Sequence, residues 1–433
     1  MTPQRMSWGR WPRHEHHVFS LSNRFAPLPV FDSMLPYGNG RSYGDVCQND
    51  GGHLLVTRGL DRFIAFDPAS GVLDCEAGVL LSEIIDLVLP RGWFPMVTPG
   101  TRFVTIGGAI ANDVHGKNHH RAGSFGNHVL DFDLLRSDGS VLRCSRDVNR
   151  EWFAATVGGL GLTGLILRAR IQLRPVPGPW IGGDSLRFGS LNEFFALSTA
   201  SDAGYEYTVA WIDCAAAGRN LGRGVFMRGN HVPASGWEPN GRSLRMPLTP
   251  PLSLINSVSL RLFNQLYFHR PGARLDNAVW HYRPFFYPLD SVLEWNRIYG
   301  PKGFFQYQCA VPQQGAEEAL TEMLRRIAKS GLGSFLAVLK LFGHVPSQGM
   351  LSFPRPGATL ALDFPNRGPV TLALLESLDA ITRDVGGAVY PAKDARMSSV
   401  SFKQYYPAWK EFARYVDPHF SSSFWRRVTE DMK

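Results

Sequence analysis

The first 178 residues alternate short apolar runs with glycine-rich loops, a pattern that predicts strands and only brief helices. Strand-like runs occupy four ranges: His53–Thr57, Val129–Leu135, Val141–Cys144 and Leu165–Leu173. Two helical runs lie between them, at Ser82–Leu89 and Glu151–Val157, and Pro90 ends the first. The turn Ser137-Asp-Gly-Ser between two of the strand-like runs predicts a strand pair.

The pattern of apolar and polar residues changes after Pro175-Val-Pro-Gly-Pro, which predicts a domain boundary near residue 178. The strand-like runs beyond it are Tyr205–Ile212, Phe304–Val311, Ser334–Lys340 and Thr359–Phe364. Helices are predicted at Gly315–Ser330 and Val370–Val385, whereas the Pro- and Ser-rich residues 231–258 suggest a long loop. The order strand, helix, strand, strand, helix predicts an antiparallel sheet covered on one face.

Composition narrows the class of protein. A chain of 433 residues suggests two or three domains. Its five cysteines are scattered and show no metal-binding spacing, so we expect reduced thiols in a reducing compartment. No run of about 18 apolar residues is present, which argues against a membrane span. The first residues lack the apolar run of a secretory signal, and we therefore expect a cytoplasmic protein.

The net charge of +8 is concentrated in one segment. Between Ala217 and Arg274 there is one acidic residue, Glu238. The same segment holds eight arginines: Arg219, Arg223, Arg228, Arg242, Arg245, Arg261, Arg270 and Arg274. No nucleic-acid-binding motif accompanies them, so we expect no nucleic-acid partner.

The segment Thr98–His128 carries the strongest chemical signal in the chain. It contains six glycines, four histidines and three asparagines around one short apolar run, a composition poorly suited to a core. Small residues let a backbone approach a ligand closely, and Asn, His and backbone N–H groups donate directed hydrogen bonds. We interpret the segment as the wall of a pocket for a large, flat, polar cofactor.

Two segments resemble the dinucleotide fingerprint, and neither has its context. Gly159-Leu-Gly-Leu-Thr-Gly164 follows a predicted helix and opens a strand, the reverse of the order that places a helix N-terminus on a pyrophosphate. Gly38-Asn-Gly-Arg-Ser-Tyr-Gly44 leads to another loop and strand. A glycine-rich turn can still hold a pyrophosphate through consecutive backbone N–H groups, although an ordinary tight turn is the alternative.

Several polar residues stand out against apolar surroundings. Lys340 interrupts an apolar strand, where it either extends to the surface or faces a polar cavity. Gln306 and Gln308 share one face of a strand and suit the hydroxyls of a sugar. Lys393 is flanked by Tyr390 and Asp394, so it is a candidate base or charge clamp, or else one half of a surface ion pair.

The histidines raise the possibility of a metal site. His115, His119 and His120 are closely spaced, but Gly116 and Asn118 disfavour a helix that would align them. No carboxylate or cysteine ligand lies nearby in the sequence. We expect no metal, and contact with a cofactor or substrate for His115.

Taken together, these blocks resemble the decaprenylphosphoryl-β-D-ribose 2′-oxidases, flavoproteins of the vanillyl-alcohol-oxidase-like superfamily. The similarity runs from Ser7-Trp-Gly-Arg almost to the end of the chain. It rests on GNGRSYGD, PGTRFVTIGGAIANDVHGKNHHRAGSFGNHV, FYPLDSVLEWNRIYGPKGFFQYQ, LKLFG, LSFPRPG, LDFPN and YPAKDAR. The tail lacks the His-Trp-x-Lys motif that is usual in the aldonolactone oxidase branch.

The resemblance implies an α+β fold with a two-lobed FAD-binding domain of the PCMH type. This domain would span residues 6–178. A substrate domain with an antiparallel sheet covered by helices would span 179–387, and residues 388–433 would return to the FAD domain. The residues implied to contact FAD are Pro36, Tyr37, Gly38, Asn39, Gly40, Arg41, Ser42, Tyr43, Gly44, Asp45, Val46, Gly100, Thr105, Ile106, Gly107, Gly108, Asn112, Asp113, Val114, His115, Ile166 and Tyr390.

The FAD is expected to be non-covalent, because Arg41 stands where many relatives carry the histidine that bonds to the flavin. The implied reaction oxidises the ribose 2′-hydroxyl of a polyprenylphosphoryl-β-D-ribose to the ketone. Lys393, Tyr43 and His115 would act at the reacting carbon. Gln306, Gln308, Lys340 and Lys117 would bind the sugar. Ala361 replaces the cysteine at which covalent inhibitors attack mycobacterial members.

The resemblance also implies partners. An NAD(P)H-dependent short-chain reductase would complete the epimerisation to the arabinose donor for envelope arabinan. The apolar run Leu252–Phe268, with Arg261, Arg270 and Arg274, would lie on the inner membrane as a peripheral contact. The alternatives are a soluble aldonolactone or alditol oxidase, an oxidase of another lipid-linked pentose, and a non-catalytic flavin- or lipid-binding protein.

Overall fold

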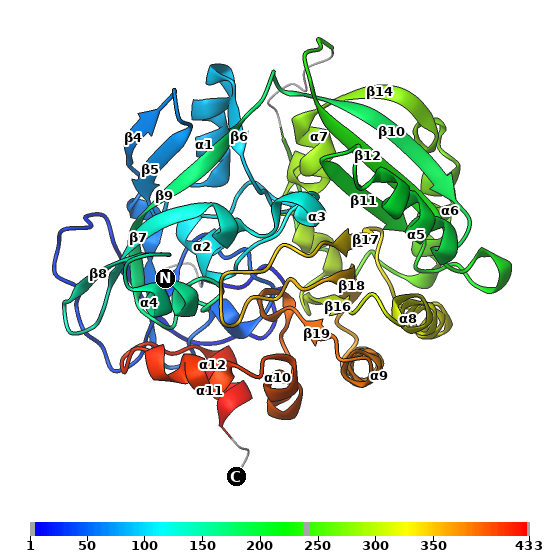
Figure 1. The fold of residues 1–433 in the computed structure, drawn as a ribbon. Helices are drawn as coiled ribbons and strands as arrows, with labels where there is room; N and C mark the ends of the chain where they lie inside the picture. Colours follow the sequence, from blue (N-terminus) through cyan, green and yellow to red (C-terminus); the bar gives the residue numbers. More distant parts are fainter. Residues whose placement is uncertain (1–4, 237–242, 431–433) are drawn as a thin grey trace.

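The N-terminal part of the chain builds two sheets that lie at the left of Figure 1. The computed structural model describes residues 5–236 and 243–430. A parallel sheet has the order β1 (His17–Ser20), β3 (His53–Val56), β2 (Met34–Tyr37). An antiparallel sheet has the order β4 (Phe63–Asp67), β5 (Val72–Glu76), β9 (Leu165–Pro175), β7 (Val129–Leu135), β8 (Val141–Ser145), with β6 (Trp93–Pro95) also on β9.

Short helices connect these strands. They are α1 (Leu81–Val88), α2 (Ile106–Ala111), α3 (His119–Ala122) and α4 (Arg150–Thr156). The predicted strand pair β7–β8 is confirmed, and α1 and α4 each begin one residue earlier than the sequence predicts. The glycine-rich segment Gly159–Gly164 lies between α4 and β9, so it has the reversed context that argued against a dinucleotide fingerprint.

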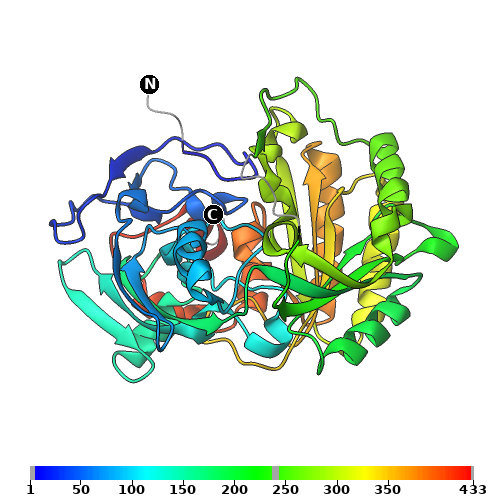
Figure 2. The ribbon, with the colours of Figure 1, turned by 90° about the horizontal axis from the view of Figure 1, so that it is seen from above.

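The C-terminal part builds one antiparallel sheet of eight strands. Its order is β14 (Leu275–His281), β10 (Trp180–Phe188), β12 (Gly224–Val232), β11 (Tyr207–Ile212), β17 (Ala337–Phe342), β18 (Gly357–Pro365), β16 (Phe304–Val311), β19 (Ala388–Val389). The chain enters this sheet between β9 and β10, where the sequence predicts a boundary. Figure 2 shows the two lobes side by side.

Helices cover one face of the eight-stranded sheet, as the sequence predicts. They are α5 (Leu191–Ser201), α8 (Ala316–Ser330) and α9 (Pro369–Asp384), on the right-hand side of Figure 1. The apolar stripe of α8, with Leu320, Met323 and Ile327 fully buried, packs into the same core as Leu360 and Leu362 of β18. Alternate residues of β16, β17 and β18 therefore point away from the helices, toward the N-terminal lobe.

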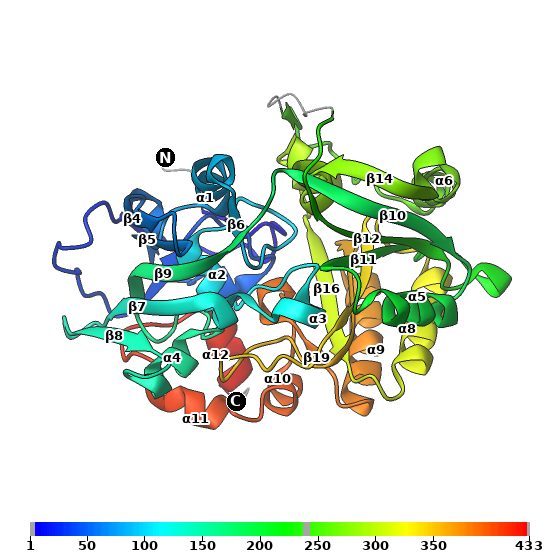
Figure 3. The same ribbon diagram turned by 45° about the horizontal axis from the view of Figure 1, so that its top comes forward.

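Several elements were not predicted. Strands β10, β12 and β14 were missed, and so were α5 and helix α6 (Ser257–His269), which lies at the rim of the sheet in Figure 3. Gly182 and Gly183 weaken the strand pattern of β10, yet a Cβ on Gly183 would collide with the backbone of Arg228 on β12. Helix α6 begins at Asn256, whose side chain accepts the N–H groups of Val258 and Ser259.

The C-terminal segment packs under the N-terminal lobe (Figure 1). It forms α10 (Ser399–Tyr405), α11 (Trp409–Phe412) and α12 (Ser423–Thr429). Phe420 makes a parallel bridge with Met34 of β2, and Arg427 of α12 forms an ion pair with Asp45 at 2.7 Å. Across the described residues, the helices are too short or too polar to cross a lipid bilayer.

Candidate active site

A cavity of about 420 Å³ lies between the two lobes. The loop after β2 and helix α2 form its N-terminal wall. The exposed face of β16, β17 and β18 forms the opposite wall, and the turn that carries Lys393 closes one end. Residues far apart in the sequence therefore meet in one space.

The loop after β2 offers unused hydrogen-bond donors to this cavity. In the described part of the chain, the backbone N–H groups of Asn39, Gly40, Arg41 and Ser42 donate to no protein acceptor. The Asn39 side chain ties the loop to Phe103 by a 2.7 Å bond to its carbonyl oxygen. Successive free N–H groups in a turn form a concave site for an anion such as a pyrophosphate.

Glycines let this loop approach helix α2. A Cβ on Gly38 would collide with the side chain of Thr105, and a Cβ on Gly107 would come within 3.1 Å of the Cβ of Ala77. Thr105 caps α2 by accepting the N–H of Gly108 at 3.1 Å. The Cβ of a residue replacing Gly100, which lines the cavity, would have no heavy atom within 4 Å. The cavity is therefore open along this side.

At the cavity, Nε of Arg41 and Oδ1 of Asn112 are buried and have no hydrogen-bond partner among the described residues. The Arg41 guanidinium stacks over Trp8 with its carbon 4.0 Å from the ring centroid, and burial lowers the pKa of Arg41. Unsatisfied buried polar atoms are costly, so these two atoms indicate a polar ligand that would supply the missing hydrogen bonds.

The wall formed by the eight-stranded sheet presents amides and an ammonium group. The side-chain nitrogen of Gln308 lies 2.9 Å from Nε2 of His115, and Nζ of Lys340 lies 2.9 Å from Nδ1 of the same ring. Lys340 also donates to the carbonyl oxygen of Gly116 at 3.0 Å. The strand register places Gln306 opposite Asp363 and Lys340 opposite Thr359, all on this face.

Burial shifts the protonation of these groups. Desolvation lowers the pKa of Lys340 to about 7, and the nearby ammonium groups of Lys117 and Lys393 act in the same direction. Desolvation and then the charge of Lys340 hold the pKa of His115 well below its usual value. The imidazole of His115 is therefore neutral at pH 7, and its Nδ1 can accept a hydrogen bond from the ammonium of Lys340.

Lys393 ends a short 3-10 helix, η9 (Pro391–Lys393), next to the loop after β2. The N–H of Tyr43 donates to Ala392 at 2.9 Å, and Nζ of Lys393 lies 3.9 Å from the centroid of the Tyr43 ring. Desolvation lowers the pKa of Lys393 to about 7, opposed by the negative charge of Asp363.

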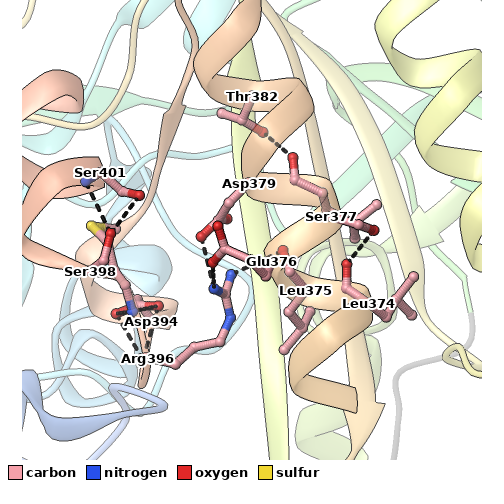
Figure 4. Close-up of polar contacts among 12 residues, drawn as sticks. Leu374, Leu375, Glu376, Ser377, Asp379, Thr382, Asp394, Arg396, Ser398 and Ser401 are labelled. Atoms are coloured by element: carbon pink, nitrogen blue, oxygen red, sulfur yellow. Dashed lines mark hydrogen bonds and ion pairs between the residues drawn. The ribbon is translucent and has the colours of Figure 1, made fainter. Parts of the chain in front are cut away.

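The turn after Lys393 is held rigidly (Figure 4). Asp394 accepts the backbone N–H groups of Arg396 and Met397, and it forms an ion pair with Arg427 at 3.0 Å. Arg396 in turn reaches Asp379 of α9 at 2.8 Å. The surface ion pair considered for Lys393 and Asp394 is therefore absent, because the Asp394 carboxylate is buried against other partners.

The structure brings most of the predicted site residues to the cavity. Six do not line it: Tyr37, Gly44, Asp45, Ile106, Asp113 and Lys117. The hydroxyl of Tyr37 donates to Met6, and Asp45 pairs with Arg427. Lys117 is half-buried with its ammonium 5.2 Å from the centroid of the Phe285 ring, and desolvation lowers its pKa to about 8.

Sequence reasoning missed several polar residues at or near the cavity, among them Thr359, Asp290, Arg245 and Asp363. Thr359, Asp290 and Arg245 line the cavity, and the buried Asp363 lies directly behind Gln306, which donates to it at 2.7 Å. The period of two along β18 could have found Thr359 and Asp363, since both share the face of Ala361, which also lines the cavity.

Comparisons with known proteins agree with this geometry. The family described as FAD binding domain matches residues 32–145. Decaprenylphosphoryl-beta-D-ribose oxidase of Mycolicibacterium smegmatis is 39% identical over 99% of this chain and 97% of its own length. An uncharacterised protein in the mprA 5′ region of Streptomyces coelicolor is 36% identical over 81% of this chain and 100% of its own length. Cytokinin dehydrogenase 7 of Oryza sativa subsp. japonica is 30% identical over 44% of this chain and 37% of its own length.

The fold and the cavity define an FAD-dependent flavoprotein oxidoreductase. The free N–H groups of residues 39–42 fit a pyrophosphate, and the glycine-lined face of α2 with the unpaired Oδ1 of Asn112 fits a flat polar ring system. Over nearly its whole length the chain belongs to the family of decaprenylphosphoryl-β-D-ribose oxidases.

Proposed function

We propose that the protein oxidises the 2′-hydroxyl of a polyprenylphosphoryl-β-D-ribose to the 2′-keto sugar, the first half of an epimerisation to the arabinose donor. The observation that carries this proposal is the convergence of two lysines, two glutamines, a tyrosine and a histidine on one end of the FAD cavity. FAD, when bound, supplies the two-electron acceptor for the hydride that leaves C2. The relative from Mycolicibacterium smegmatis carries the name of an oxidase of this substrate.

The protein's own contribution is to bind and orient the sugar and to manage one proton. Gln306 and Gln308 offer amides to the ribose hydroxyls from the wall opposite α2. Lys340, held by His115 and Gly116, contributes a rigid positive charge close to the sugar. Lys393 is placed to meet the reacting hydroxyl, and its pKa of about 7 suits a group that must hold or accept a proton near neutral pH.

The flavin is proposed to be non-covalent. Arg41 occupies the position of the linking histidine, and a guanidinium cannot form that bond. Its stacking on Trp8 and its buried, unpartnered Nε suit a hydrogen bond to the cofactor or to an anionic ligand instead. Acid precipitation of the purified protein should therefore release all of its FAD into the supernatant, whereas a covalent flavin would stay in the pellet.

An anaerobic visible spectrum tests the reaction. A short-chain prenylphosphoryl-β-D-ribose should bleach the oxidised flavin band of the purified protein, and the free aldonolactones and alditols should not. Bleaching by a soluble sugar alone would favour the aldonolactone or alditol oxidases. Absence of bleaching by every sugar would favour a binding protein.

A membrane contact is proposed on the segment that precedes and includes α6. Leu244, Leu248 and Leu252 are each at least 74% exposed, and Leu262 and Leu266 of α6 are more than 60% exposed. Leu244 and Arg245 form strand β13, which pairs with Val292–Leu293 at the rim of the cavity. An apolar surface beside the cavity entrance, close to several arginines, fits a lipid-linked substrate in an anionic bilayer.

The surrounding charges refine that proposal. Arg223 and Arg228 pair with Asp213 and Asp184, so they are structural rather than lipid-facing. Arg242 and Glu238 lie outside the described residues. Flotation with liposomes of anionic phospholipid should therefore respond to Leu262→Glu combined with Leu266→Glu. The matched Val400→Glu, which also changes an exposed apolar residue, should float like the wild type; equal flotation of all three proteins would exclude this surface.

An NAD(P)H-dependent short-chain reductase is the proposed partner. The product of the proposed reaction is a ketone, and reducing it from the opposite face completes the epimerisation. Neither glycine-rich segment of this chain has the strand-to-helix context of a nicotinamide site. The keto sugar should therefore accumulate until a reductase and NAD(P)H are added.

A further inference from the structure

Buried carboxylates in this protein are usually paired with arginine. Asp45 pairs with Arg427, Asp213 with Arg223, and Asp417 with Arg136, all within 3.2 Å. This arrangement is expected, because an unpaired buried charge is costly. Asp363 is an exception: its residue is 1% exposed, and in the described part of the chain it forms no ion pair.

Neutral donors surround Asp363 instead. The side-chain nitrogen of Gln306 donates to Oδ1 at 2.7 Å, and the hydroxyl of Tyr299 donates to Oδ2 at 3.4 Å. Gln306 lines the cavity and Asp363 lies behind it, on the paired strand β18. Lys393 lines the same cavity as Gln306, and the charge of its ammonium acts on Asp363 to lower the pKa of the carboxyl.

We infer that Asp363 is a positioning residue that acts through Lys393 and Gln306: its negative charge keeps Lys393 protonated at the reacting hydroxyl, and its hydrogen bond fixes the Gln306 amide toward the sugar. This inference rests on the proposed function, because it assigns a task to the lysine that meets the substrate. It names a carboxylate that the family resemblance did not imply.

The other groups that face Asp363 are consistent with this task. Tyr43 and Tyr299 are fully buried phenols whose pKa values burial raises well above 10, so they stay neutral and cannot balance the charge of Asp363. Gln306 has no charge. Burial raises the pKa of Asp363 to about 7, opposed by the hydrogen bond from Gln306 and by the charge of Lys393. Asp363 and Lys393 therefore titrate in the same pH range and respond to each other.

Removing the charge of Asp363 should lower the pKa of Lys393 further, because a negative neighbour favours the charged form of a lysine. Asp363→Asn keeps the size of the side chain and its contact with Gln306, but not the charge. The pH at which Lys393 loses its proton should fall by about one unit in this variant.

Competitive labelling of the FAD-loaded protein with acetic anhydride measures this midpoint without any substrate. The rate of acetylation at Lys393, read by mass spectrometry between pH 5 and pH 10, should rise at lower pH in Asp363→Asn than in the wild type. Asp363→Glu should return the midpoint toward the wild-type value. Asp213→Asn is the matched control, because it removes a buried carboxylate far from the cavity and should leave the Lys393 midpoint unchanged.

Flavin reduction by prenylphosphoryl ribose gives the second readout. Asp363→Asn should shift the pH profile of the reduction rate in the same direction as the labelling midpoint, with bound FAD unchanged. Coincident labelling curves for Asp363→Asn and the wild type would overturn the inference, even if the substrate bleaches the flavin. Shifted curves with no bleaching in the wild type would instead support the coupling and count against the proposed reaction.

Discussion

Arginines of β9 form ion pairs with carboxylates in the N-terminal lobe, whereas, among the described residues, the lysines that line the cavity form none. On the outer face of the antiparallel sheet, Arg168 of β9 reaches Asp133 at 2.7 Å, Asp74 at 2.9 Å and Asp131 at 3.2 Å. Lys340 and Lys393 are half-buried at the cavity, and in the described part of the chain neither forms an ion pair.

The charged residues of the two regions therefore have different tasks: the paired arginines stabilise the fold, and the unpaired lysines are available to a ligand. The arginines of β9 are neutralised where they stand, and they hold β5, β7 and β9 together. Desolvation lowers the pKa values of the two cavity lysines to about 7, and the charge of Asp363 opposes that shift at Lys393. A substrate with a phosphodiester would supply the negative charge that these lysines lack. Its hydroxyl, which must lose a proton, would meet a lysine that can take one near neutral pH.

The largest effect is expected from Lys393→Ala. The variant should keep its FAD, because the residues that fit the cofactor lie on other elements, but flavin reduction by the substrate should slow by roughly 10²–10⁴-fold, the usual contribution of a positioned acid or base. Stopped-flow absorbance of the flavin band measures the rate. Lys329→Ala, which removes a lysine near the end of α8, should reduce at the wild-type rate. Undiminished turnover in Lys393→Ala would remove this residue from the mechanism.

Strongly patterned elements were predictable from the sequence, and weakly patterned ones were not. Strand β16 was predicted with its observed bounds, and α8 was predicted to within one residue, because their apolar positions follow one clear period. Helix α6 was missed because Leu262 and Leu266 face outward and no buried apolar stripe forms; within this helix only Leu260 and Asn264 are buried. A helix that turns apolar side chains to the surface breaks the rule on which such predictions depend.

The parts of the candidate site that could be predicted are those whose structure depends on residues close together in the sequence. The glycine-rich loop after β2 and the cap of α2 are local features, and both line the cavity. Lys117 and Asp363 depend on packing between distant strands, which no local pattern reports. Lys117 is turned toward Phe285, and Asp363 faces the cavity wall only because β18 pairs with β16 in one particular register.

A smaller effect, on stability, is expected from breaking the paired region. Asp131 is 2% exposed and forms ion pairs with Arg143, Arg168 and Arg170, so Asp131→Asn leaves three guanidinium groups with less compensation. The free energy of unfolding should fall by about 3 kcal/mol, which is the lower end of the range observed when a buried ion pair loses one partner. Urea denaturation followed by far-UV circular dichroism measures the change. Asp138→Asn, on an exposed turn, should leave stability nearly unchanged; similar losses in the two variants would show that the β9 network does not stabilise the fold.

The smallest effect is expected from Lys340→Met, and this substitution should raise the free energy of unfolding rather than lower it. Below pH 7 the lysine is charged in both the folded and the unfolded protein, so folding carries the full cost of burying the charge. That cost falls as the pH rises from about 7, where the folded lysine loses its proton, to 10.5, where the unfolded lysine does. The methionine variant should therefore be more stable than the wild type by on the order of 2 kcal/mol at pH 6, and the gain should vanish near pH 10.5. Thermal unfolding of the two proteins across this range tests the prediction, with Lys329→Met as the exposed control; a gain that does not vary with pH would mean that packing, rather than the unpaired charge, limits stability at the cavity.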